Sequence, residues 1–212
     1  MSKRRRSGRR SNKPAQGKGV AIPERGFFDG RIVGLLAPVL TGMLLAISFA
    51  PIDVFFVAYI ALVPWMLVLC RKRQRKPVLW AFASGAVYWL VSVYWLSWVT
   101  PAGYAAAALY LASYWVITAC VIRGVGKRGW PAWIVVPVIW VSLEFIRAYV
   151  ISGFPWFYLA LTQYRQLWLI QLADTTGEYG ISVFVAMVNG LVVDLIRWRW
   201  MAKGGFCLPS RR

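Results

Sequence analysis

The sequence predicts an all-α membrane protein, a bundle of about six transmembrane helices with an interfacial or re-entrant loop on the outer side. Composition is the first observation: of 212 residues, 59% are hydrophobic and only 15% are charged, against roughly 45–50% and about 25% in a soluble domain. Uncharged stretches also recur at the length of about 20 residues that crosses a bilayer. Lastly, 25 Lys and Arg face 7 Asp and Glu, and the basic residues separate those stretches, as cytoplasmic loops do.

Six segments have the length and composition of membrane spans. The first follows a basic tail and is longer than the apolar core of a secretory signal, which has roughly 7–15 residues, so we expect an uncleaved span. Pro51-Ile52-Asp53 and Pro101-Ala102-Gly103 are predicted as the turns that follow the first and third spans. The predicted spans are residues 32–50, 54–70, 78–99, 104–122, 130–151 and 179–196.

The distribution of basic residues predicts the topology. Of the 25 Lys and Arg, 23 lie in four segments that six spans place on one side, which should be the cytoplasm. These segments are a disordered tail at 1–31, two loops at 71–76 and 123–128, and a second tail at 197–212. The membrane domain is thus residues 32–196, with both termini cytoplasmic. A seventh crossing at residues 151–173 would move the basic C-terminal tail outside, so we favour six.

Residues 152–178 are less regular than the spans. Gly and Pro interrupt this stretch, and it is rich in aromatic side chains. Aromatic residues concentrate at the membrane–water interface, and irregular backbone at membrane depth needs protein around it. We therefore expect the segment to lie at the outer interface or to dip part-way into the membrane.

Glu144 and Arg147 are charged residues within the fifth predicted span. Ionisable groups there are costly and are usually paired or functional, and a spacing of three puts both on one helix face. One hypothesis is a phospholipid headgroup site near the outer surface, where Arg147 faces the phosphate and Glu144 holds it in place. The alternative is a structural ion pair that anchors loop 152–178.

The residues that usually carry catalysis are scarce. The chain has no histidine, which excludes a His-based triad and a His-liganded metal site. Its cysteines, Cys70, Cys120 and Cys207, lack the paired spacing of a zinc ribbon, and none has an identifiable base beside it in the sequence. We therefore predict no catalytic residue, no metal and no cofactor in this chain.

Short motifs follow one another along the segments assigned to the outer side. They are Ser48-Phe49-Ala50-Pro51, Glu144-Phe145-Ile146-Arg147, Gly153-Phe154-Pro155-Trp156, Thr162-Gln163 and Gly177-Glu178-Tyr179-Gly180-Ile181-Ser182. Each is common alone. In this order and spacing they resemble the membrane portion of apolipoprotein N-acyltransferases, over about residues 32–196. Ala160-Leu161 stands where that family usually has Gly-Tyr.

The resemblance implies a bacterial inner-membrane protein with phospholipid and lipoprotein as partners. The family moves an acyl chain from a phospholipid to the α-amine of a lipoprotein's N-terminal diacylglyceryl-cysteine, through a thioester. Its catalytic Glu, Lys and Cys lie in a periplasmic nitrilase-like domain that follows the spans, and no such set in this chain can be matched to them. We therefore expect the membrane portion of such an enzyme, truncated or split, not catalytic alone and with a separately encoded nitrilase-like subunit as a possible partner.

The motifs also supply candidate lipid- or substrate-binding residues. Phe154, Pro155 and Trp156 could line the route of the lipid, although an ordinary interfacial aromatic belt explains them as well. Gln163 and Tyr179 complete the set with Glu144 and Arg147. Two other functions remain open, a stand-alone lipid- or partner-binding membrane protein and a small transporter. A nucleic-acid binder is the weakest alternative, because the charges flank the spans instead of forming one surface.

Overall fold

The computed structural model describes residues 31–69, 76–126, 128–151 and 153–201. Every regular element in these ranges is an α-helix or a short 3₁₀ helix (η), which confirms the predicted all-α class. The elements are α1 (Arg31–Ile47), η2 (Phe55–Tyr59), α2 (Val63–Leu69), α3 (Pro77–Ser92), η3 (Tyr94–Trp98), α4 (Pro101–Gly126), α5 (Ala132–Tyr149), η4 (Leu159–Gln163), α6 (Leu167–Ile170) and α7 (Ala173–Met201).

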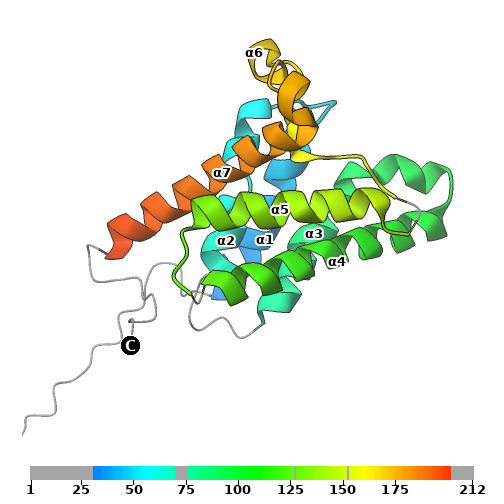
Figure 1. Ribbon diagram of the computed structural model, residues 1–212. Coiled ribbons are helices and arrows are strands. Elements are labelled where there is room, and N and C mark those ends of the chain that lie inside the picture. Colours follow the sequence, from blue (N-terminus) through cyan, green and yellow to red (C-terminus); the bar gives the residue numbers. More distant parts are fainter. Residues whose placement is uncertain (1–30, 70–75, 127, 152, 202–212) are drawn as a thin grey trace, which may run out of the picture.

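The helices form one bundle in which α5 lies between α4 and α7 (Figure 1). On the far side, α3 packs against both α4 and α1. Three helices are long and apolar enough to cross a membrane: Pro101–Gly126, Ala132–Tyr149 and Ala173–Arg199. The other three predicted spans appear as shorter apolar helices, Leu36–Ile47, Phe55–Leu69 and Pro77–Ser92.

Two predicted spans are interrupted. The second consists of η2 and α2, which are separated between Tyr59 and Val63, and the third passes from α3 into η3 after Ser92. The break in the second span is stabilised from α7: the side chain of Asn189 accepts a hydrogen bond from the Leu62 amide (3.0 Å) and donates to the Ala58 carbonyl (2.8 Å). Unpaired backbone groups are expensive in lipid, so this contact makes the break tolerable.

Some predicted boundaries were wrong. Pro101–Gly103 is no turn but the first turn of α4, a position that proline tolerates because its missing N–H has no helical partner there. The last helix begins at Ala173, six residues before the predicted span, and is interrupted at Gly177, whose φ of 66° is a conformation that glycine adopts without a steric penalty. At its other end α7 continues through residues 197–201. Residues 1–30 and 202–212, most of the two predicted tails, lie outside the described residues, as do Cys70 and Cys207.

The loop after α5 forms one end of the bundle, with α6 projecting from it (Figure 1). It is joined to η2 by Gln163, whose amide donates to the Phe55 carbonyl (3.1 Å) and accepts from the Tyr59 hydroxyl (3.0 Å). A second connection is the salt bridge of Arg165 to Asp53. The buried Gln163 bonds hold the loop over the end of α5, where Glu144 and Arg147 lie.

Candidate functional site

Glu144 and Arg147 lie near the C-terminal end of α5 and face the interior of the bundle. Each is only 5% exposed. Their shared face results from the spacing of three in a helix, as the sequence predicted. Both side chains reach the backbone of residues 157–159, the segment that leads into η4.

Glu144 uses one of its two carboxylate oxygens. Its Oε1 accepts hydrogen bonds from the indole N–H of Trp140 (2.9 Å) and from the backbone N–H of Leu159 (2.8 Å). Its Oε2 is buried and has no hydrogen-bond partner within the described part of the chain. The carboxylate therefore fixes the start of η4 and keeps one oxygen free for a further donor.

Arg147 lies in a cage of aromatic rings. The central carbon of its guanidinium lies 4.9 Å from the ring centre of Trp89, 5.4 Å from that of Tyr158 and 6.0 Å from that of Phe154. These distances are in the range of cation–π attraction. The only side-chain hydrogen bond it makes to a described residue is a long one, 3.5 Å from Nη2 to the Phe157 carbonyl, and its Nε is buried without a partner.

Glu144 and Arg147 form no direct ion pair. Among the residues that the structure describes, salt bridges within 4.0 Å join Arg165 to Asp53 and Arg197 to Asp194. The structure therefore does not show the direct Glu144–Arg147 ion pair of the alternative hypothesis. The two side chains still anchor the loop, but separately: Glu144 accepts from the Leu159 amide and Arg147 donates to the Phe157 carbonyl. A direct pair would have satisfied both charges, whereas this arrangement leaves hydrogen-bonding capacity on each.

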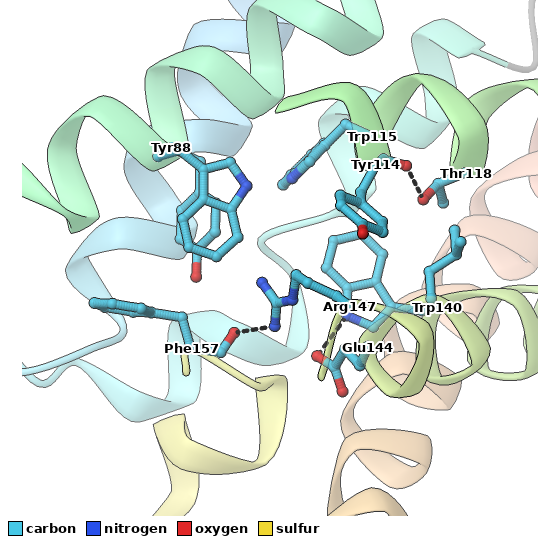
Figure 2. Close-up of a pocket in the computed structure, with 10 residues that line it drawn as sticks. Tyr88, Tyr114, Trp115, Thr118, Trp140, Glu144, Arg147 and Phe157 are labelled. Atoms are coloured by element: carbon cyan, nitrogen blue, oxygen red, sulfur yellow. Dashed lines mark hydrogen bonds between the residues drawn. The ribbon is translucent and has the colours of Figure 1, made fainter. Parts of the chain in front are cut away.

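A small cavity adjoins the two charged groups, and in Figure 2 the Arg147 guanidinium points toward Tyr88 and the Phe157 carbonyl. Its volume is about 30 Å³, enough for about two water molecules. It is lined by Tyr88, Trp89, Tyr114, Trp115, Thr118, Trp140, Leu143, Glu144, Arg147 and Phe157.

Unpaired buried polar atoms concentrate around this cavity. Within the described ranges seven buried side-chain atoms lack a partner, and four of them belong to its lining: Tyr88 Oη, Trp89 Nε1, Glu144 Oε2 and Arg147 Nε. Buried polar groups are normally hydrogen-bonded, so such a cluster has room for bound water or for polar atoms of a ligand. Three of these groups donate and the fourth, a carboxylate oxygen, accepts, so the site suits water or a ligand group that carries acceptor oxygens together with a donor.

The aromatic motif after α5 divides between the cage and the surface. Phe154 packs against Trp89, with ring centres 5.6 Å apart, and belongs to the Arg147 cage. Pro155 and Trp156 are exposed. The Trp156 ring lies 5.9 Å from that of Trp95 in η3, so these exposed rings form an apolar rim beside the cage.

Gln163 and Tyr179 take different positions. Gln163 is fully buried, and its hydrogen bonds connect η4 to η2, away from the cavity lining. Tyr179 is half-buried, with its ring 5.6 Å from that of Tyr158, which in turn contacts Arg147. Burial, followed by the hydrogen bond with Tyr179, raises the pKa of the Tyr158 hydroxyl.

Comparison with known proteins identifies the family. Residues 41–191 match the model of the apolipoprotein N-acyltransferase N-terminal domain. The chain belongs to this family. Apolipoprotein N-acyltransferases similar to it include that of Geobacter metallireducens, which is 36% identical over 188 residues, 84% of this chain and 34% of that protein. Those of Chlorobaculum tepidum (29% over 183 residues, 80% and 34%) and Coxiella burnetii (27% over 188 residues, 80% and 38%) follow.

The match confirms the predicted family and shows which part of the related proteins this chain covers. The chain spans about one third of the length of these curated apolipoprotein N-acyltransferases. Glu144, Arg147 and every other predicted site residue lie inside the region matched by the N-terminal domain of the acyltransferase. The cage and its cavity therefore lie in the part of this chain that matches the apolipoprotein N-acyltransferase N-terminal domain.

Three members of the Arg147 site were not predicted from the sequence, namely Tyr88, Trp89 and Tyr158. Tyr88 and Trp89 lie in the third predicted span, where nothing in the local sequence distinguishes them from other apolar-facing aromatic residues. Tyr158 follows directly on the Gly-Phe-Pro-Trp motif and could have been included with it. Within the described part of the chain, His, Cys, Asp and Glu side chains nowhere gather in a group of three or more that could hold a metal.

Proposed function

We propose that this chain is the membrane portion of an apolipoprotein N-acyltransferase that binds the phospholipid acyl donor and positions it, without itself transferring the acyl chain. Support comes from the relatives, which bear that enzyme name and match the chain over about one third of their length. The 212 residues offer no Glu, Lys and Cys set that matches the family's catalytic residues. Binding and positioning are the steps that the described residues can perform.

The observation that carries the proposal is the Arg147 site. A buried guanidinium with an unpaired Nε lies beside a cavity where other unpaired donors gather. Arginine is well suited to phosphate because its N–H groups are planar and always charged. We infer that Arg147 binds the phosphate of a phospholipid headgroup and that Glu144 holds the adjoining loop in place.

Entry of a headgroup requires the loop to move. At about 30 Å³ the cavity holds water-sized occupants as it stands. Phe157, which covers Arg147, has a φ of 58°, a conformation that is unfavourable for a residue with a side chain. A displacement of residues 153–158 would relieve this strain and open the cage, and the exposed Trp156 and Pro155 would meet the lipid first.

We further propose that the domain lies in the bacterial inner membrane with both termini in the cytoplasm. The support is the basic segments, since 23 of 25 Lys and Arg fall on one side of a six-span arrangement. On this topology the loop after α5, the Arg147 cage and α6 face the periplasm. The entry to the cage at the outer interface is then surrounded by Phe154, Pro155, Trp156 and Tyr179. Gln163 fixes the loop by its hydrogen bonds to η2.

Transfer to a lipoprotein needs residues that this domain does not supply. We propose that a nitrilase-like partner carries the catalytic Glu, Lys and Cys and docks on the outer side of the bundle. Exposed tryptophans there, Trp98, Trp156 and Trp168 among them, offer an apolar surface. Aromatic side chains of this kind are enriched in protein interfaces.

The test places the purified chain in vesicles of phosphatidylethanolamine and phosphatidylglycerol with a fluorescent diacylglyceryl lipopeptide. We expect no N-acylated lipopeptide and no acyl thioester on the protein, detected by mass spectrometry. A full-length apolipoprotein N-acyltransferase in the same vesicles is the positive control. Acyl transfer or thioester formation by this chain alone would contradict the proposal.

A further inference from the structure

A groove runs along the outside of the bundle between α5 and α7, separate from the Arg147 cavity. Its volume is about 580 Å³. The α5 wall presents Val138, Val141, Ser142 and Phe145, and the α7 wall presents Tyr179 and Val183. The groove thus lies between two of the helices that are long and apolar enough to cross a membrane.

The walls of the groove offer an occupant only apolar contacts along its length. Val138 is 61% exposed, Phe145 is 51% exposed and Val183 is 39% exposed. The one hydroxyl on the α5 wall, that of Ser142, donates to the Val138 carbonyl of its own helix at 2.6 Å. Among the residues that the structure describes, none that lines the groove is charged. Between Val138 and Val183, away from the Tyr179 end, a polar or charged ligand would therefore lose its solvation without gaining a partner.

The two ends of the groove are set by close contacts between α5 and α7. At one end, the ring of Tyr179 lies 5.8 Å from that of Phe145. Toward the other, Gly190 lets the helices approach so closely that an added Cβ would lie 2.5 Å from the Ala132 carbonyl oxygen. The stretch of α5 that lines the groove, residues 137–146, is about 14 Å long at 1.5 Å per residue. The groove thus follows α5 over this length, beside a region where α5 and α7 are closely packed.

The position of the groove within the hydrocarbon core of the membrane limits which molecules can fill it. In the hydrocarbon core there is no water, and an empty groove would leave its wall atoms without contacts. A hydrocarbon chain is the one occupant that a bilayer supplies at this depth. Since lipid tails are as apolar as the walls, close packing along a fixed groove, and not the hydrophobic effect, would hold such a chain.

We propose that this groove binds one acyl chain of a resident phospholipid, which stays with the protein while the surrounding lipids exchange. The Tyr179 end then receives the glycerol and headgroup of this lipid. The resident lipid supports the α5–α7 pair and does not react. The groove shares Tyr179 with the proposed entry to the Arg147 cage, but its lining includes neither Arg147 nor Glu144, so either proposal can fail without the other.

The experiment uses the full chain in vesicles of phosphatidylethanolamine and phosphatidylglycerol with a trace of phosphatidylcholine that carries a diazirine in the middle of one acyl chain. Brief illumination cross-links the lipid, and peptide mass spectrometry locates the adducts. We expect adducts concentrated on Val138, Val141, Phe145 and Val183. Adducts spread over all exposed apolar residues in proportion to their area would overturn the proposal, because they indicate exchanging lipid only.

Two variants fill the groove from opposite walls, Val138→Trp on α5 and Val183→Trp on α7. Either should remove most of the groove adducts, provided that its circular dichroism spectrum and thermal melting match those of the wild type. Ile117→Trp is the control, since Ile117 is 46% exposed on α4 and lies outside the groove. Unchanged groove adducts in a folded groove variant, or an equal loss of adducts in Ile117→Trp, would overturn the proposal of a resident lipid.

Discussion

Two clusters of buried polar groups in this bundle differ in how completely they are satisfied. Around Asn189, the side-chain amide makes three hydrogen bonds, from the Leu62 amide and to the Ala58 and Val185 carbonyls. Around Arg147, one carboxylate oxygen, one guanidinium nitrogen and two aromatic polar atoms have no partner. Both clusters are buried, and both lie between helices that are distant in the sequence.

This difference in hydrogen bonding indicates that the Asn189 cluster supports the fold and that the Arg147 cluster can accept a ligand. Asn189 closes the break between η2 and α2, where the helix would otherwise leave backbone groups unpaired in an apolar surrounding. The Arg147 cluster closes no break and keeps spare donors beside a cavity. Substitutions should accordingly affect stability most in the first cluster and lipid binding most in the second.

The largest loss of stability is expected for Asn189→Leu. Three hydrogen bonds disappear and the Leu62 amide and Ala58 carbonyl lose their partner, which should lower the free energy of unfolding by about 3 kcal/mol. Unfolding in mixed micelles of dodecyl maltoside and sodium dodecyl sulfate measures it. Thr118→Val is the control, because the Thr118 hydroxyl bonds only the Tyr114 carbonyl of its own helix. Equal losses of stability in both variants would mean that the hydrogen bonds of Asn189 contribute no more than that of Thr118.

A smaller loss, about 2 kcal/mol, is expected for Glu144→Leu, since the Leu159 amide and the Trp140 indole lose their acceptor. Glu144→Gln retains an acceptor oxygen and should lose under about 1 kcal/mol. Hydrogen exchange of the Leu159 amide gives a local measurement, and it should accelerate in the leucine variant alone. The same exchange rate in both variants would mean that Glu144 does not fix the loop.

Gly190→Ala tests the helix contact that adjoins the Asn189 cluster. The added methyl would meet the backbone of Ala132 and Trp133, which cannot move aside as a flexible side chain can. Overpacking of this kind costs about 1–2 kcal/mol. Gly124→Ala on α4 is the matched control, because nothing lies within 4 Å of its Cβ position, and it should be neutral or slightly stabilising. A neutral Gly190→Ala would show that α5 and α7 are less tightly packed than described.

The smallest effect is expected at the exposed outer salt bridge. Arg165 bonds Tyr164 and Asp53, and these two partners in that order raise its pKa, but its side chain is 66% exposed. Water and salt screen the exposed guanidinium, and Asp53, whose side chain is 6% exposed, keeps the hydrogen bond from the Tyr164 hydroxyl when Arg165 is removed. Arg165→Ala should leave the melting temperature unchanged in 150 mM and 1 M NaCl. A clear drop at low salt alone would mean that this contact holds the loop after α5.

The sequence predicted the helical class and most of the helix positions, because hydropathy and length are local properties. The breaks in the second and third spans were missed, since the break after η2 depends on Asn189, which lies 127 residues from Leu62. Glu144 and Arg147 were found because charges are rare in spans. Their partners were not, since whether Arg147 faces Glu144 or Trp89 depends on how α3 packs in the bundle.

Phosphate binding by Arg147 is the central proposal, and titration of a short-chain phosphatidylglycerol against the protein in dodecyl maltoside tests it most directly. Trp89 lies beside the guanidinium, so tryptophan fluorescence reports the binding. Loss of one charged hydrogen-bond donor predicts about tenfold or more weaker binding for Arg147→Leu, with Arg165→Leu, the other outer arginine, unchanged. Wild-type affinity in a folded Arg147→Leu protein, or an equal loss of affinity in both variants, would contradict phosphate binding by Arg147.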